Sequence, residues 1–112
     1  MLEVAAARYH PTPSTTANAA EGAECRAWTL DARQAAAFLR LSRPLAEGEL
    51  HEFAWLPCSV GGRLRTEGRE WAFEINAAGT SIWRSGDEAR LLGCDRAECG
   101  AYVILMPERA PE

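Results

Sequence analysis

The four cysteines have the most varied chemical potential of any residues in this chain. They are Cys25, Cys58, Cys94 and Cys99. Structural zinc sites usually combine two paired motifs, each with two to four residues between the thiols. Here only Cys94 and Cys99 form such a pair, and the other two cysteines are solitary. Free, half-buried thiols are the first expectation, a Cys94–Cys99 disulfide the second, and zinc held by Cys94, Cys99 and the other two thiols the third.

A nucleophilic thiol is a further use for one of these residues. Cys58 precedes Ser-Val-Gly-Gly, and His51 lies seven positions earlier. A Cys58–His51 dyad needs a sharp turn at Pro57, and the sequence offers no third group to orient the histidine. His10 lies in a segment where a catalytic base would be poorly held. The expectation is therefore no catalytic residue and no cofactor, with a thiol-dependent enzyme or redox protein as the alternative.

Charged residues form a second group with potential function. Arg63 and Arg65 are expected to face Glu70 and Glu74 across two neighbouring strands. Paired carboxylates can perform acid–base chemistry, but neighbouring arginines hold them ionised. This pattern favours a solvated sheet face whose Arg/Glu rows select a protein partner. The acidic turn with Asp87 and Glu88 is the second candidate for partner binding.

A β-hairpin positions these charges. The dipeptide Glu67-Gly68 is typical of a two-residue turn, and it places Leu64 opposite Trp71. Cross-strand partners share a face of the sheet, so one face is polar and the other apolar. The apolar face is predicted to contain Val60, Leu64, Trp71, Phe73 and Ile75.

One amphipathic helix is predicted over residues 32–41. Asp31 is the expected N-cap, and Gln34 completes a capping box. Pro44 prevents much continuation beyond Ser42. The helical spacing creates a stripe that is expected to pack on the sheet, formed by Ala35, Phe38, Leu39 and Ser42.

The remaining pattern completes an α+β fold. The Ala77-Ala78-Gly79 segment predicts a three-residue loop that pairs Phe73 with Trp83, and residues 85–88 predict a turn. Further strands are expected over residues 49–55, 90–93 and 101–106, the last in the middle of the sheet under the helix. The prediction is one domain over residues 25–112, in which an antiparallel sheet of about five strands packs against one helix. Residues 1–24 are expected to form a loose arm, with an edge strand over residues 2–5.

Composition and net charge limit the classes of function that this chain is expected to have. The chain has 112 residues and a net charge of −4, and residues 49–112 contain eleven acids against seven arginines. An acidic surface disfavours nucleic acid and anionic membranes and suits a basic partner. No apolar run approaches the roughly 20 residues that span a bilayer. The amino terminus lacks the basic and apolar regions of a signal peptide, so a cytoplasmic location is expected.

One stretch resembles known sequences. Residues 71–83, followed by Gly93-Cys94 and Cys99, resemble a stretch in small uncharacterised proteobacterial proteins, some of which are immunity proteins. The resemblance covers about a third of the chain and transfers no functional residue. It implies a small bacterial binding protein. The leading expectation is a non-enzymatic cytoplasmic protein that binds another protein, as an immunity protein neutralising a basic toxin domain. A structural zinc-binding module is the alternative.

Overall fold

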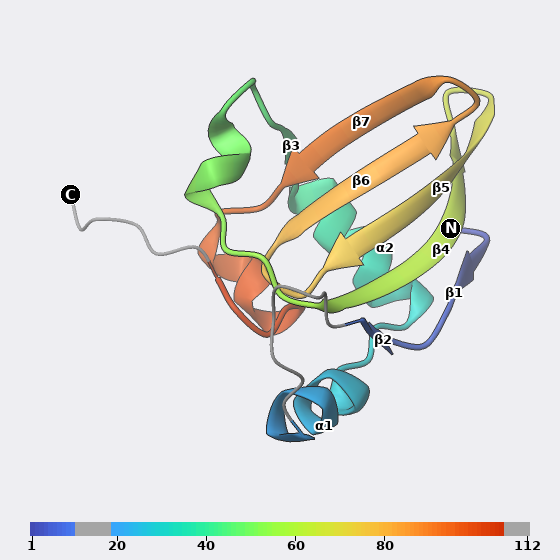
Figure 1. Cartoon of the computed structure of the whole chain (residues 1–112). Helices are drawn as coiled ribbons and strands as arrows, with labels where there is room; N and C mark the ends of the chain where they lie inside the picture. Colours follow the sequence, from blue (N-terminus) through green and yellow to red (C-terminus); the bar gives the residue numbers. More distant parts are fainter. Residues whose placement is uncertain (11–18, 107–112) are drawn as a thin grey trace.

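The protein is a single α+β domain in which an α-helix packs on one face of an antiparallel sheet (Figure 1). The computed structural model describes residues 1–10 and 19–106. Within them the sheet has the strand order β1-β4-β5-β6-β7-β3, and β2 also pairs with β4. The strands are β1 (Glu3–Val4), β2 (Arg8–Tyr9), β3 (Arg43–Pro44), β4 (Cys58–Thr66), β5 (Arg69–Asn76), β6 (Thr80–Ser85) and β7 (Glu88–Gly93). The helices are α1 (Ala19–Ala27), α2 (Ala32–Leu41) and the 3₁₀ helices η1 (Glu49–Glu52) and η2 (Ala97–Ala101).

The β4–β5 hairpin has the predicted register. Leu64 pairs with Trp71 and Thr66 pairs with Arg69, so Glu67 and Gly68 form the turn. Both turn residues have positive φ, 55° and 73°, as a turn matched to the twist of the strands requires. The whole predicted apolar face is buried, namely Val60, Leu64, Trp71, Phe73 and Ile75.

The next two connections are also confirmed. Phe73 pairs with Trp83 across the β5–β6 loop, in which Gly79 has a φ of 103°. Ser85 pairs with Glu88 across the β6–β7 turn. Four consecutive strands, β4 to β7, therefore form a meander in which each strand pairs with the next.

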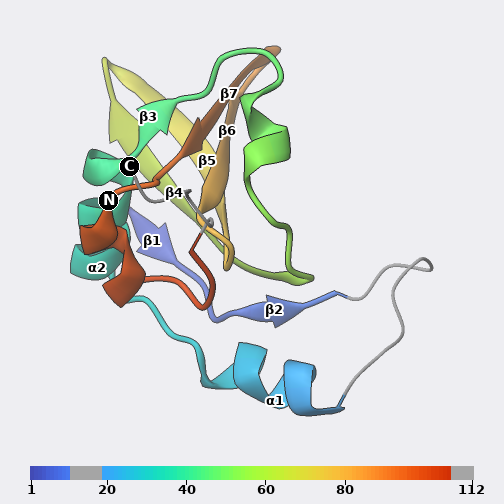
Figure 2. The ribbon, with the colours of Figure 1, turned by 90° about the vertical axis from the view of Figure 1, so that its left-hand side faces the viewer.

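Helix α2 covers one face of this meander, as predicted. The Asp31 side chain accepts a hydrogen bond from the Gln34 backbone N–H at 2.8 Å, and the Gln34 side chain accepts one from the Asp31 N–H at 2.9 Å. Ala35 and Phe38 are fully buried. Figure 2 shows the layers: α2 and η2 lie on one side of the sheet and η1 on the other.

The predicted strand over residues 49–55 is wrong. Residues 49–52 form η1, which begins after Gly48 at a φ of 88°. The Glu49 carboxylate accepts a hydrogen bond from the Ala46 N–H at 2.7 Å, which favours a local turn over an extended chain. The neighbouring place at the sheet edge is occupied by β3, which pairs with β7.

The predicted central strand over residues 101–106 is also wrong. Residues 97–101 form η2, and the chain then follows an irregular path. The backbone N–H groups of Ile104 and Leu105 both donate to the Ala77 carbonyl, at 2.9 and 3.0 Å. Val103, Ile104 and Met106 pack on the edge of the core as a half-buried cover. Their apolar character therefore reflects packing on the core, and the meander leaves no central place for another strand.

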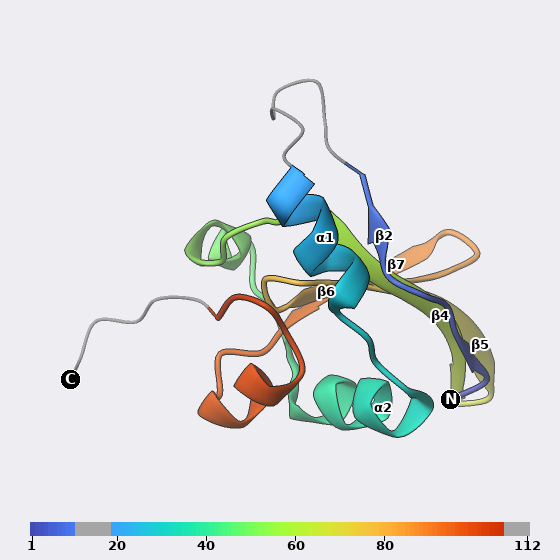
Figure 3. The ribbon, with the colours of Figure 1, turned by 90° about the horizontal axis from the view of Figure 1, so that it is seen from below.

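Residues 1–10 add two short strands to the sheet. Strand β1 pairs with β4 at the predicted edge position, and β2 pairs with β4 through Arg8 and Ser59. Of the remaining residues of the expected loose arm over residues 1–24, residues 11–18 lie outside the described residues, and residues 19–24 begin α1. Figure 3 shows α1 beside β2, at the end of the sheet where β4 begins.

Candidate functional site

The candidate site is the face of the sheet opposite α2, which we call the open face. Its members are side chains of β4 to β7 that point away from α2 and are exposed: Arg63, Arg65, Glu70, Ala72, Glu74, Arg84 and Ala89. All four charged residues predicted from the hairpin belong to this set. The register of β5 with its two neighbours adds Arg84 to the charges of the hairpin. Ala72 of β5 pairs with Arg63 of β4 on one side and with Arg84 of β6 on the other.

Arg63 is the centre of an ion-pair cluster on the open face. Its guanidinium donates to Glu70 at 2.8 Å and to Glu3 of β1 at 3.1 Å. The hydrogen bond from Arg63, followed by its positive charge, lowers the pKa of Glu3. All three side chains are about half exposed, so water screens the pairs and their effect on stability is small.

Three other charges on the open face remain available. Arg65, Glu74 and Arg84 form no ion pair with any residue in the described part of the chain. Arg65 lies opposite Glu70, but Glu70 is already bonded to Arg63. The expected Arg/Glu ladder is therefore incomplete, which leaves charges of both signs facing solvent.

The turn with Asp87 and Glu88, the second predicted binding element, is joined to the scaffold through Glu88. The Glu88 carboxylate accepts hydrogen bonds from Arg69 at 2.9 Å and from Arg90 at 3.2 Å. The bond from Arg69 is the largest cause of a lowered pKa at Glu88. Both guanidinium groups lie over the Trp71 ring, at 4.6 and 4.5 Å from its centroid. Glu88 therefore holds two cations against a buried tryptophan, and partner binding by this turn stays a prediction.

A small polar pocket of about 220 Å³ lies at the other end of the open face. The His10 Nε2 and Ser59 Oγ atoms are 3.0 Å apart, and Arg8 and Glu74 also line the pocket. A serine–histidine contact can support nucleophilic catalysis, but Ser59 is only 5% exposed in the interior of β4. No local sequence signal indicated this pair, because only the β2–β4 register brings the two residues together.

The cysteines form two disulfides. Cys25 of α1 is bonded to Cys58 of β4, and Cys94 is bonded to Cys99. This corrects the first expectation of free thiols. The Cys94–Cys99 bond was the second expectation, whereas the Cys25–Cys58 bond was not anticipated. With all four sulfurs bonded, neither a Cys58 nucleophile nor a thiolate zinc site is present in this oxidised form.

These disulfides also correct the expected cytoplasmic location. Disulfides persist in oxidising compartments and are rare where glutathione and thioredoxin keep thiols reduced. Two of them in one small domain suggest an oxidising, extracytoplasmic location. Among the described residues, no helix combines the length and the apolar character that crossing a membrane requires.

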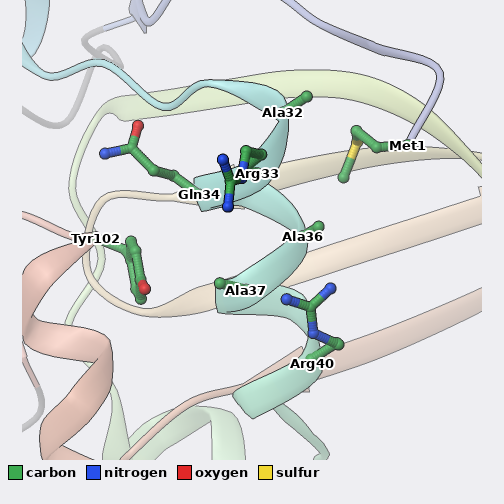
Figure 4. Close-up of a pocket in the computed structure, with 8 residues that line it drawn as sticks. All are labelled: Met1, Ala32, Arg33, Gln34, Ala36, Ala37, Arg40 and Tyr102. Atoms are coloured by element: carbon green, nitrogen blue, oxygen red, sulfur yellow. The ribbon is translucent and has the colours of Figure 1, made fainter.

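A hollow of about 530 Å³ lies on the outward side of α2, away from the open face (Figure 4). Small side chains, Ala36 and Ala37, lie between Arg33 and Arg40 on successive turns of the helix. Tyr102 closes one side and Met1 the other. The two guanidinium groups make this hollow basic, in contrast to the acidic chain as a whole.

No protein-family model matches this chain, and no curated protein or solved structure shows significant similarity to it. The fold and the site thus define it only as a disulfide-bonded α+β domain with a charged, exposed region on one sheet face.

Proposed function

We propose that this protein is a non-enzymatic binding protein of an oxidising compartment, and that the open face of its sheet contacts another protein. The observation that carries the proposal is the uncovered row formed by Arg63, Ala72 and Arg84 on a sheet whose opposite face is packed under α2. A small residue between two arginines lets a partner approach closely and meet both guanidinium groups. Arginine is enriched at protein interfaces because its planar group makes several directed hydrogen bonds.

Two further observations support binding rather than catalysis. The thiols that a cysteine enzyme needs are bonded, and the only serine–histidine contact found in the described residues is largely closed to solvent. The Cys25–Cys58 bond also ties α1 to the start of β4. A scaffold held in this way loses little conformational freedom on binding, which favours affinity.

Among binding functions, we place first that of an immunity protein, which binds and neutralises a toxin. The resemblance of residues 71–83 to small uncharacterised proteobacterial proteins, some of which are immunity proteins, motivates it. Because the two disulfides suggest an extracytoplasmic location, the partner in this proposal is a toxin domain that acts outside the cytoplasm. A toxin encoded next to this protein is therefore the first candidate to purify and test.

Site-specific photocrosslinking tests the proposal in the source cells. A photoreactive amino acid replaces Ala72 in the full chain, and in a control chain it replaces Arg33 on the outward face of α2. We expect an adduct of one defined mass from the Ala72 position, and much less of it when Arg84→Glu is added. An Ala72 probe that gives no adduct, or the same adduct from both positions regardless of Arg84→Glu, would contradict the proposed function.

A further inference from the structure

Residues 45–56 form a projection on the same side of the sheet as the open face, which we call the knob (Figure 2). Both of its ends are tied to the sheet. The Leu45 N–H donates to the Leu91 carbonyl at 3.0 Å. At the other end, the Asn76 amide accepts from the Leu56 N–H at 3.2 Å and donates to the Leu56 carbonyl at 2.7 Å. The knob is therefore a closed loop on a rigid base.

The centre of the knob is held by Phe53, which is only 9% exposed. Its ring lies over two glycines, Gly79 and Gly93. A Cβ atom at Gly93 would lie 2.8 Å from the Phe53 ring, closer than real Cβ contacts, and one at Gly79 would lie 3.7 Å from it. The absence of side chains at these positions creates the space that Phe53 fills. Leu45 also lies over Gly93 and Leu56 packs on the main core, so these two leucines and Phe53 together attach the knob to the sheet.

Leu50 and Trp55, by contrast, face solvent. Leu50 is 45% exposed and Trp55 is 49% exposed, and the Trp55 ring lies 5.9 Å from the His10 ring, centroid to centroid. The segment contains no Arg or Lys. Glu49 is paired with Arg43 at 2.8 Å, but Glu47 and Glu52 are exposed. The knob therefore displays a leucine and a tryptophan beside two negative charges that form no ion pair within the described residues.

We infer that the knob is the anchor by which this protein binds a cationic partner, with Trp55 and Leu50 entering an apolar cleft edged by Lys or Arg. This inference rests on the proposed function and specifies the chemistry of the partner. Tryptophan dominates interface hot spots, particularly on a rigid support surrounded by polar residues. The charges of Glu47 and Glu52 steer a basic surface toward the knob and disfavour an anionic membrane.

A second copy of the chain is a less suitable occupant. The basic hollow beside α2 has matching charge, but it lies on the side of the sheet opposite the knob (Figure 2). Knob-to-hollow contacts would be head-to-tail, and such contacts produce rings or open filaments rather than a simple dimer. A different, cationic protein satisfies the same chemistry without polymerisation.

Designed peptides test the inference on the full, oxidised protein. The probe is an amphipathic helical peptide of Leu and Lys, and two controls replace its Lys by Glu or its Leu by Ser. We expect measurable binding of the probe by fluorescence anisotropy. Both control peptides and the L50A/W55A variant should bind at least about tenfold more weakly. The matched variant Leu105→Ala, which removes a leucine 41% exposed elsewhere, should bind like the wild type.

The role of the knob's negative charges and the kind of partner that it binds are tested in separate experiments. Replacing Glu47 and Glu52 by Gln should lower the association rate and flatten its salt dependence, whereas Glu98→Gln on η2 should change neither. Equal binding of the acidic peptide, or unchanged affinity of the L50A/W55A variant, would overturn the inference. Self-association or anionic-vesicle binding that Trp55→Ala abolishes would assign the knob to another occupant and would also overturn it.

Failure of the anchor role and failure of the proposed binding function give different results. If the partner crosslinked at Ala72 binds the L50A/W55A variant as tightly as wild type, the anchor role fails and the binding function stands. If Ala72 gives no adduct, the binding function fails whatever the peptides show.

Discussion

The two faces of this sheet differ in almost every physical respect although their residues alternate along the same strands. On β5, Trp71, Phe73 and Ile75 point toward α2 and are buried, whereas Glu70, Ala72 and Glu74 point the other way and are exposed. The covered face provides the burial that holds the domain together. The open face provides little stability, and for that reason its residues can be selected for recognition. Substitutions on the covered face should therefore mainly lower the stability of the fold, whereas substitutions at neighbouring positions on the open face should mainly weaken partner binding.

The largest expected effect is on the covered face. Trp71→Ala should lower the free energy of unfolding by about 3–5 kcal/mol, because it removes a fully buried aromatic ring and two cation–π contacts. Glu74→Ala, three positions away on the open face, should change it by less than about 0.5 kcal/mol. Denaturant melts of the oxidised proteins measure both values. Similar losses for the two variants would remove the distinction between the faces.

The next largest effects on stability are expected at the two disulfides, and the two bonds should contribute unequally. In the loop-entropy model, a bond between residues 33 apart contributes about 3–4 kcal/mol and one between residues five apart about 2 kcal/mol. Replacing Cys25 and Cys58 by Ala should therefore cost more stability than replacing Cys94 and Cys99. Thiol titration of the unreduced wild-type protein should detect no free thiol. The reverse order of stabilities would show that strain or residual unfolded structure outweighs loop closure here.

A smaller effect should appear in acid. Hydrogen bonds from arginines lower the pKa values of Glu3, Glu49 and Glu88 below the ordinary value of 4.5. A carboxylate with a depressed folded-state pKa stabilises the fold above its unfolded pKa, and this contribution disappears as the pH falls through the folded value. Melting temperatures should thus decline below about pH 4.5.

The variant E3Q/E49Q/E88Q should show a shallower decline in the same acid titration. The control is Glu74→Gln, on the open face, which removes a carboxylate that forms no ion pair in the described part of the chain. A triple variant with the same acid slope as wild type would mean that these pairs are already broken in solution.

The smallest effect on stability is expected on the open face itself. Arg84→Glu should change the free energy of unfolding by less than about 0.5 kcal/mol, since Arg84 is exposed and forms no ion pair within the described residues. Its expected effect is instead on binding, through loss of the Ala72 adduct. A destabilisation above 1 kcal/mol would assign Arg84 to the scaffold.

The sequence was informative wherever the controlling interactions are local. The Glu67-Gly68 turn and the alternation around Trp71 were sufficient for the hairpin register, and Asp31 with Gln34 was sufficient for the start of α2. The sequence was misleading at residues 49–55 and 101–106, where apolar residues alternate or cluster without belonging to a strand. In both segments a distant contact decided the path: Phe53 over Gly93, and Ile104 bonded to Ala77.

For the candidate site, the sequence by itself determined which hairpin charges share a face, because the side-chain period of a strand is two residues. Only the tertiary structure brought His10 to Ser59 and exposed Trp55 on the knob. Tertiary packing likewise joined Cys25 to Cys58, and with that bond the expected compartment changed. A turn or a cap is encoded by residues that are neighbours along the chain. Contacts between distant segments depend on how the entire core packs, and no short stretch of sequence contains that information.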